Sequence, residues 1–147
     1  MQIAQLGTNA ERVNVVFKNV DGGGSVTTGL GVCLVQAGAS IDGISSVLST
    51  AGTWNGFIGV SIQDVPINGI GLATCGGYVA SVLISNVGTS ITITAGDTLK
   101  PGAVSGTMFS SLTDQAVSTL FYRYVYAANT NTISAAAYVV GIVKACF

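Results

Sequence analysis

Short runs of alternating apolar and polar residues recur along the chain, and most end at glycine, proline, asparagine or aspartate. The run 13–18 alternates almost strictly, which places Val13, Val15 and Phe17 on one face, and the run 90–94 repeats the pattern. A period of two is typical of strands that bury one face. No stretch sustains the 3.6-residue period of a helix, so the pattern predicts an all-β chain.

Turn signals divide the apolar segments into about eight short strands. Pro66 and the pair Asn68-Gly69 predict a tight hairpin turn. Gly76 and Gly77 predict a bulge that joins two segments into one bent strand, because glycine accepts positive φ. The remaining strands are expected at 30–35, 57–62, 120–126 and 138–146. This spacing predicts an antiparallel sandwich or barrel with glycine-rich turns.

Two segments have weaker patterns. The Gly/Ser-rich region 38–53 is expected to be a long loop with one short strand, and 113–120 to form one or two helical turns with Thr113 as N-cap.

The residues expected in the core are Ile58, Val60, Val79, Leu83, Ile91, Ile93, Val140 and Ile142.

A length of 147 residues suits a single domain with its own core. Residues 13–147 are expected to form that β-rich domain. Residues 1–12 have mixed polarity and too little apolar periodicity for a core strand, so they are predicted to be an N-terminal arm that orders on a neighbouring molecule. The candidate contact residues of this arm are Met1, Gln2, Ile3, Gln5 and Leu6.

Charge is scarce: 11 of the 147 residues are Asp, Glu, Lys or Arg, and the net charge is −1. A nucleic-acid partner needs a basic field, which such a chain lacks. A net charge near zero promotes association, so we expect the chain to work within an assembly, as a homo-oligomer. The alternative is a soluble monomer coated by its 29 Ser and Thr residues.

Membrane insertion is not expected. The longest apolar stretch near the C-terminus, 135–143, ends at Lys144 and is much shorter than the ~20 residues of a spanning helix. The first residues have neither the basic region nor the apolar region of a signal peptide.

The sequence offers little for catalysis. Without histidine, neither a Ser-His-Asp nor a Cys-His site can form. The carboxylates lie mostly beside turn residues, where aspartate accepts hydrogen bonds from nearby backbone N–H groups; they are Glu11, Asp21, Asp42, Asp64, Asp97 and Asp114. We therefore expect no enzyme and no cofactor. Calcium at Asp21, or at Asp64 with Asn68, is the one metal alternative.

The three cysteines form no metal-binding or redox motif. An odd number without a secretory signal favours reduced thiols, which pack as small apolar groups. Cys33 and Cys146 lie in apolar strands and are expected to be buried. The neighbouring Gly76 and Gly77 leave the exposure of Cys75 open.

An aromatic strand is the candidate contact surface within the domain. Alternation places Tyr122, Tyr124 and Tyr126 on one face, with Phe121 and Val125 opposite. Tyrosine is enriched at protein interfaces, although a half-buried sheet face explains the pattern as well. Base stacking is less favoured, because only Arg123 supplies charge nearby.

Several segments also follow a family pattern in order. They read FIGVSIQDVPINGIGL at 57–72, GYVASV at 77–82, ITAGDTLKPG at 93–102 and VGIV at 140–143, preceded by 17–19 and 27–32. This order resembles small capsid-associated proteins of tailed bacteriophages, namely decoration (cement) proteins and related head or fibre components. The segment 104–137 departs from the family pattern.

The resemblance implies a non-enzymatic structural protein of the virion. Such a module binds the major capsid protein as a symmetric trimer, stabilises the head lattice from the capsid surface, and is made in the host cytoplasm. The family carries no catalytic residues to transfer. The alternative is a receptor- or carbohydrate-binding module of a virion fibre that uses the Tyr122, Tyr124 and Tyr126 face.

Overall fold

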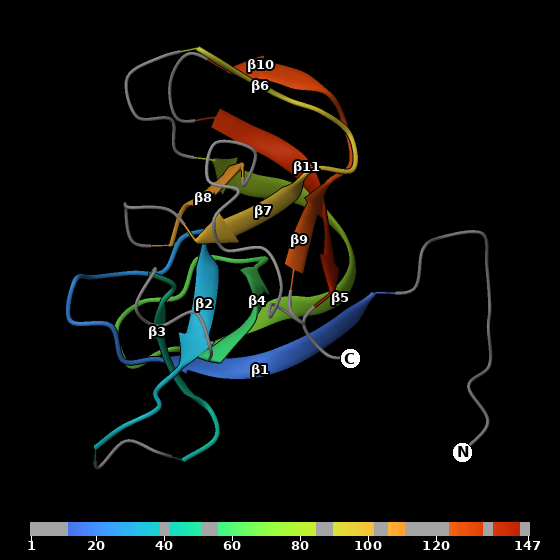
Figure 1. Cartoon of the computed structure of the whole chain (residues 1–147). Coiled ribbons are helices and arrows are strands. Elements are labelled where there is room, and N and C mark those ends of the chain that lie inside the picture. Colours follow the sequence, from blue (N-terminus) through green and yellow to red (C-terminus); the bar gives the residue numbers. More distant parts are fainter. Residues whose placement is uncertain are drawn as a thin grey trace, which may run out of the picture.

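Eleven strands and no helix make up the regular structure of residues 12–38, 42–50, 56–84, 90–101, 106–110, 124–133 and 137–144, which the computed structural model describes (Figure 1). They are β1 (Val13–Asn19), β2 (Gly31–Leu34), β3 (Ser45–Leu48), β4 (Phe57–Ser61), β5 (Ile70–Ile84), β6 (Ile91–Ile93), β7 (Thr98–Pro101), β8 (Met108–Ser110), β9 (Tyr124–Ala127), β10 (Asn131–Ile133) and β11 (Ala137–Lys144). The all-β prediction is confirmed. The helical turns expected at 113–120 lie outside the described residues.

Five strands close into a barrel in the order β1-β3-β2-β4-β5, and β5 returns to β1. Four of the five contacts are antiparallel. The exception is β1 with β3, which run parallel with Lys18 opposite Ser45. The barrel is therefore mixed, where a purely antiparallel arrangement was predicted.

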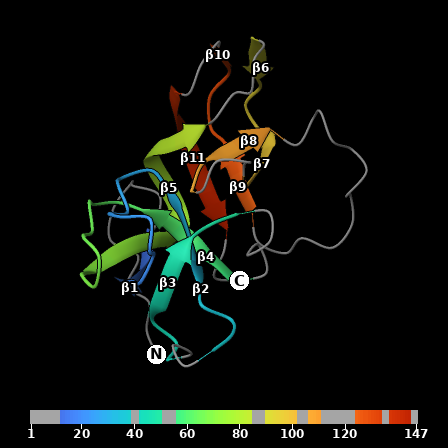
Figure 2. The same cartoon turned by 90° about the vertical axis from the view of Figure 1, so that its left-hand side faces the viewer.

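Strand β5 also belongs to a second ring of pairings. It continues to β11, β9, β7 and β8, and β8 returns to β5 through a parallel contact between Ile84 and Met108. Figures 1 and 2 show β5 leaving the barrel and entering this second ring. Strands β6 and β10 form a separate two-stranded ribbon. Every other strand of the nine-stranded sheet is thus hydrogen-bonded to β5, either directly or through neighbouring strands.

The bend of β5 lies where the glycine pair predicts it. Gly77 has φ 94°, a conformation that favours glycine. The pairing with β1 shifts at the same place, since Val13 lies opposite Gly76 while Asn14 lies opposite Thr74. The predicted bulge within one bent strand is confirmed.

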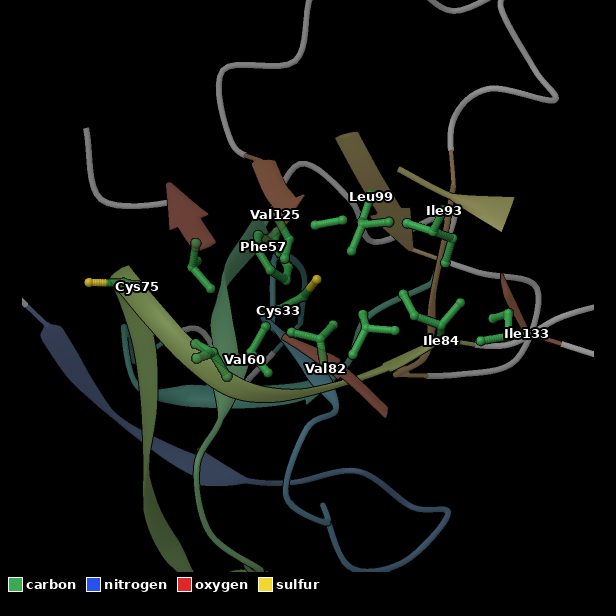
Figure 3. Packing of buried hydrophobic residues seen from close by; sticks show 14 residues of the cluster. Cys33, Phe57, Val60, Cys75, Val82, Ile84, Ile93, Leu99, Val125 and Ile133 are labelled. Carbon is green, nitrogen blue, oxygen red and sulfur yellow. The ribbon is translucent and has the colours of Figure 1, made fainter. Parts of the chain in front are cut away.

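Two clusters of buried side chains fill the molecule. One lies within the barrel and consists of Phe17, Val26, Leu30, Val32, Val65 and Ala73. The other continues from Cys33, Phe57 and Val60 into the second ring, where it includes Val82, Leu99 and Val125 (Figure 3). Because β4 contributes to this second cluster, the barrel and the second ring pack as one unit.

The predicted core is only partly correct. Val60, Val79 and Ile93 are buried, as predicted. Three others are partly exposed, namely Ile58, Leu83 and Val140, and the side chain of Ile91 lies outside the described residues.

Ile142 was predicted to be buried, and this is wrong, because it is 46% exposed. Its neighbours Gly141 and Val143 face the core instead. Along β11 the burial alternates regularly through Val139, Gly141 and Val143, so the alternation is present but in the opposite phase to the predicted one.

A buried asparagine organises the turns beside β1. The Asn19 amide donates to the carbonyls of Gly24 (2.9 Å) and Val65 (3.0 Å), and its Oδ1 accepts from the N–H of Asp21 (2.9 Å). The predicted hairpin turn lies close by: Asn68 has φ 62°, and the Gly69 N–H donates to the Pro66 carbonyl. Buried polar groups cost little when they are hydrogen-bonded in this way.

Gly59→Ala should destabilise the barrel, because a Cβ at this position would clash with the Thr74 carbonyl of β5. We expect a loss of about 1–3 kcal/mol, the usual cost of overpacking, measured from chemical denaturation. Gly22→Ala is the matched control, since nothing lies within 4 Å of the place that its added methyl group would take. Equal denaturation midpoints for the two variants would contradict the close β4–β5 contact.

Candidate functional site

The described carboxylates are occupied as acceptors in turns. The Gly23 N–H donates to Asp21 (2.7 Å), the Thr28 N–H to Asp64 (2.8 Å) and the Thr94 N–H to Asp97 (2.7 Å). The predicted turn role is confirmed for Asp21 and Asp97, whereas Asp64 accepts from a residue 36 positions away and so joins two separate loops. Glu11 and Asp114 lie outside the described residues. Within the described part of the chain, no three acidic, cysteine or histidine residues gather as a metal site would require.

Asp42 is the most strongly held of these carboxylates. The Ser45 N–H (2.5 Å), the Ser45 hydroxyl (2.7 Å) and the Ile44 N–H (3.0 Å) all donate to it. These bonds, above all the one from the Ser45 backbone, lower the pKa of Asp42 from 3.8 to about 2. The group is thus a fixed anion that orders the entry into β3, and it does not act as a proton donor near neutral pH.

The cysteines differ from the predicted set of reduced thiols. Cys33 is a buried thiol, as predicted. Cys75 is also buried, but it is disulfide-bonded, so the expectation of reduced thiols is wrong for this residue. Cys146 lies outside the described residues. Spacing along the chain does not reveal which cysteines meet across a sheet, so the disulfide could not be predicted from it.

One candidate contact surface is a row of side chains on the outer side of the second ring. Tyr126 of β9 lies opposite Ile142 of β11, and Ile142 lies opposite Tyr78 of β5. Directly opposite residues share one face of a sheet. Tyr78 is 40% and Ile142 46% exposed, and Tyr126 is half-buried. We name Tyr78, Ile142 and Tyr126 the aromatic face.

The predicted tyrosine face coincides with this surface in part. Tyr126 points outward while its neighbour Val125 is buried, as the alternation predicts. Tyr124 lies on β9 opposite Lys144, and its side chain is not among those described. The other candidates lie outside the described residues: Tyr122, Met1, Gln2, Ile3, Gln5 and Leu6. The sequence analysis did not identify Tyr78 and Ile142 as contact residues. The available signal was the glycine before each of them, Gly77 and Gly141, because a glycine within a strand often marks a bend or bulge.

A second exposed apolar surface lies on the barrel, at the start of β5. Val16 of β1 lies opposite Leu72, and Lys18 lies opposite Ile70. Val16 is 53% and Ile70 65% exposed, while Phe17 between the two β1 positions is fully buried. We name Val16, Lys18, Ile70 and Leu72 the aliphatic face. Large apolar side chains grouped on a surface commonly mark a contact with another molecule.

The ribbon of β6 and β10 presents a surface of a different kind. Thr92 and Thr132 lie opposite each other, both exposed, with their hydroxyl oxygens 3.0 Å apart. Their neighbours Ile93 and Ile133 are buried in the core. The ribbon therefore presents hydroxyl groups where the two named faces present apolar ones.

Comparison with known proteins adds no assignment: neither a protein-family model nor a curated protein matches this sequence. Likewise, no helix of the described residues has the length and apolar character to cross a membrane.

Titration by NMR should give Asp42 a midpoint near pH 2, because its donors favour the charged form. With a lowered pKa, the carboxylate stabilises the fold fully above its ordinary pKa, and this contribution is lost as the pH falls toward 2. Ser45→Ala removes one donor and should raise the midpoint part of the way to 3.8. Ser46→Ala, whose hydroxyl bonds to the Ile44 carbonyl, should leave it unchanged. A wild-type midpoint at 3.8 would contradict these contacts.

Peptide mapping of the unreduced protein should give a cross-linked pair of peptides that contains Cys75 and lacks Cys33. Cys75→Ser should abolish the cross-link and lower stability by about 2–4 kcal/mol, the typical contribution of a disulfide. Cys33→Ser is the control and should retain the cross-link. Three alkylatable thiols in every wild-type molecule would refute the disulfide.

Proposed function

We propose that this chain is a non-enzymatic structural protein of a tailed-phage virion, a decoration (cement) module that binds the head lattice. In this proposal it lies on the capsid surface, after synthesis in the host cytoplasm, with the major capsid protein as its partner. The observation that carries the proposal is the pair of exposed apolar faces on a closed β framework. Such a framework has surface for holding other proteins and little chemistry for turnover.

The use of polar groups supports a structural role. Asp42 and Asp97 accept hydrogen bonds within their own turns, whereas Asp21 also accepts from Leu48 and Asp64 accepts from Thr28, so these two join separate segments of the chain. General acid–base catalysis needs groups whose pKa lies near the operating pH, and the pKa of Asp42 is lowered well away from it. The described acids thus stabilise turns and contacts between loops.

The disulfide is compatible with a protein that works outside the cell. Disulfides persist on virion surfaces and are rare in the reducing cytoplasm. If the chain is made in the cytoplasm, the Cys75 bond forms after release, when the particle meets an oxidising medium. Reduced protein is then the form that assembles, and oxidised protein is the form that persists on the particle.

A fibre module that binds a carbohydrate is the second candidate. It is favoured by one observation: the aromatic face brings Tyr78 and Tyr126 to either side of Ile142 on an exposed sheet. Aromatic side chains with polar tips suit partly wet contacts.

The deciding experiment adds purified protein to phage heads that lack a decoration protein, and separates bound from unbound protein by sedimentation. The proposal predicts saturable binding and a higher temperature of head disruption, because many repeated contacts oppose disassembly together. A glycan array run with the same preparation should show no binding. Specific glycan binding without head binding would replace the proposal with the fibre alternative.

Deleting residues 1–11 should lower head occupancy while the β domain stays folded, because these residues make up most of the predicted arm, 1–12. Arg12, which directly precedes β1, is retained, since its Nε donates to the Tyr78 carbonyl of β5 (3.0 Å). Circular dichroism should be unchanged, and head binding should weaken at least tenfold. Wild-type occupancy and heat resistance in the truncated protein would exclude a binding role for the arm.

A further inference from the structure

We infer that the aromatic face of one copy binds the aliphatic face of the next, so that copies of this chain associate head to tail. The inference deepens the proposed function, on which it rests for its setting, by naming the two surfaces through which neighbouring copies meet. The occupant of each face is therefore a second copy of this chain.

The first support is where the exposed apolar side chains lie. The large ones are Val13, Val16, Ile44, Ile67, Ile70, Tyr78 and Ile142. Tyr78 and Ile142 form the aromatic face, and Val13 lies opposite Gly76, two residues before Tyr78. The rest belong to the aliphatic face or its border.

Backbone contacts place the two border residues beside the aliphatic face. The Ile44 carbonyl accepts from the N–H of Lys18 (2.8 Å). Ile67 lies in the turn that leads into β5, next to Asn68, whose N–H donates to the Asn19 carbonyl. The exposed apolar surface of the described chain is thus concentrated in two places.

The second support is that the two faces are different and are carried by one strand. Ile70 and Leu72 lie before the bend of β5, and Tyr78 lies after it. A two-fold contact of either face with itself would leave the other face exposed on every copy. A head-to-tail contact covers both faces with a single kind of interface, and it closes into a ring when the rotation permits.

The third support is charge. Lys18 belongs to the aliphatic face, so pairing this face with itself would bring two ammonium groups together. Pairing it with the aromatic face instead offers Lys18 the rings of Tyr78 and Tyr126, which attract a cation. The cation already at this face, Arg12, is held by the Tyr78 carbonyl, to which its Nε donates. With a net charge of −1, two copies also repel each other only weakly.

Complementation between variants tests the inference. Ile142→Asp damages the aromatic face and Ile70→Asp the aliphatic face, each at an exposed strand position. Thr132→Asp on the ribbon is the matched control. Sedimentation velocity over a range of concentrations should show each face variant associating at least about 30-fold more weakly than wild type, as for an interface hot spot, and the control associating like wild type.

The decisive sample is an equimolar mixture of the two face variants. Each retains one intact face, so the mixture should form a one-to-one dimer, held by one intact contact, and nothing larger. Tyr78→Ser and Val16→Ser, two milder changes at the same faces, guard against misfolding, and near-native circular dichroism is required of every variant. A mixture that stays monomeric overturns the inference, as does loss of association in only one of the two variants.

Head binding of the same proteins is measured in parallel, so that the two proposals can fail separately. Wild-type protein that binds heads but stays monomeric at all concentrations overturns the head-to-tail contact and leaves the proposed function standing. Protein that complements as described but binds no heads supports the contact and overturns the proposed function.

Discussion

The bend of β5 is the constraint on which the rest of the structure depends. A single strand, Ile70–Ile84, pairs with β1 and β4 before the bend and with β11 after it. Gly77 accepts the φ of 94° that this path requires. Without the bend, the strand could not close the barrel and also pair within the second ring. The same bend separates Ile70 from Tyr78, so the geometry that builds the core also determines where the two apolar faces lie.

Closure of both rings explains why faces, and not strand edges, are the candidate contacts. Exposed edges invite uncontrolled pairing with other chains, and here β1 and β8 complete the two rings against β5. The Arg12 side chain and the Gly29 carbonyl also occupy backbone groups of β5, at Tyr78 and Leu83 respectively. A chain built this way associates through its side chains, which suits assembly with defined partners.

Much of the fold could be predicted from the sequence, because alternation and turn chemistry are local. The strand at 13–18, the turn at Asn68 and the bulge at Gly76-Gly77 each follow from a few neighbouring residues. The facing of β11 could not be predicted, because residues 139–143 are apolar or glycine on both faces, so that alternation does not select the buried one. The disulfide of Cys75 and the parallel pairing of β1 with β3 are set by contacts distant in sequence. For the same reason only Tyr126 of the aromatic face could be proposed beforehand, while Tyr78 and Ile142 needed the strand register.

A cryo-EM reconstruction of purified virions that carry this protein tests the two faces and the proposed role together. We expect density for the β domain on the outside of the head, with Tyr78 and Ile142 of each copy against Val16 and Ile70 of its neighbour. Copies that stand isolated on the head, or that meet through other surfaces, would contradict the assignment of the two faces. Density for the protein elsewhere on the virion would contradict the proposed role itself.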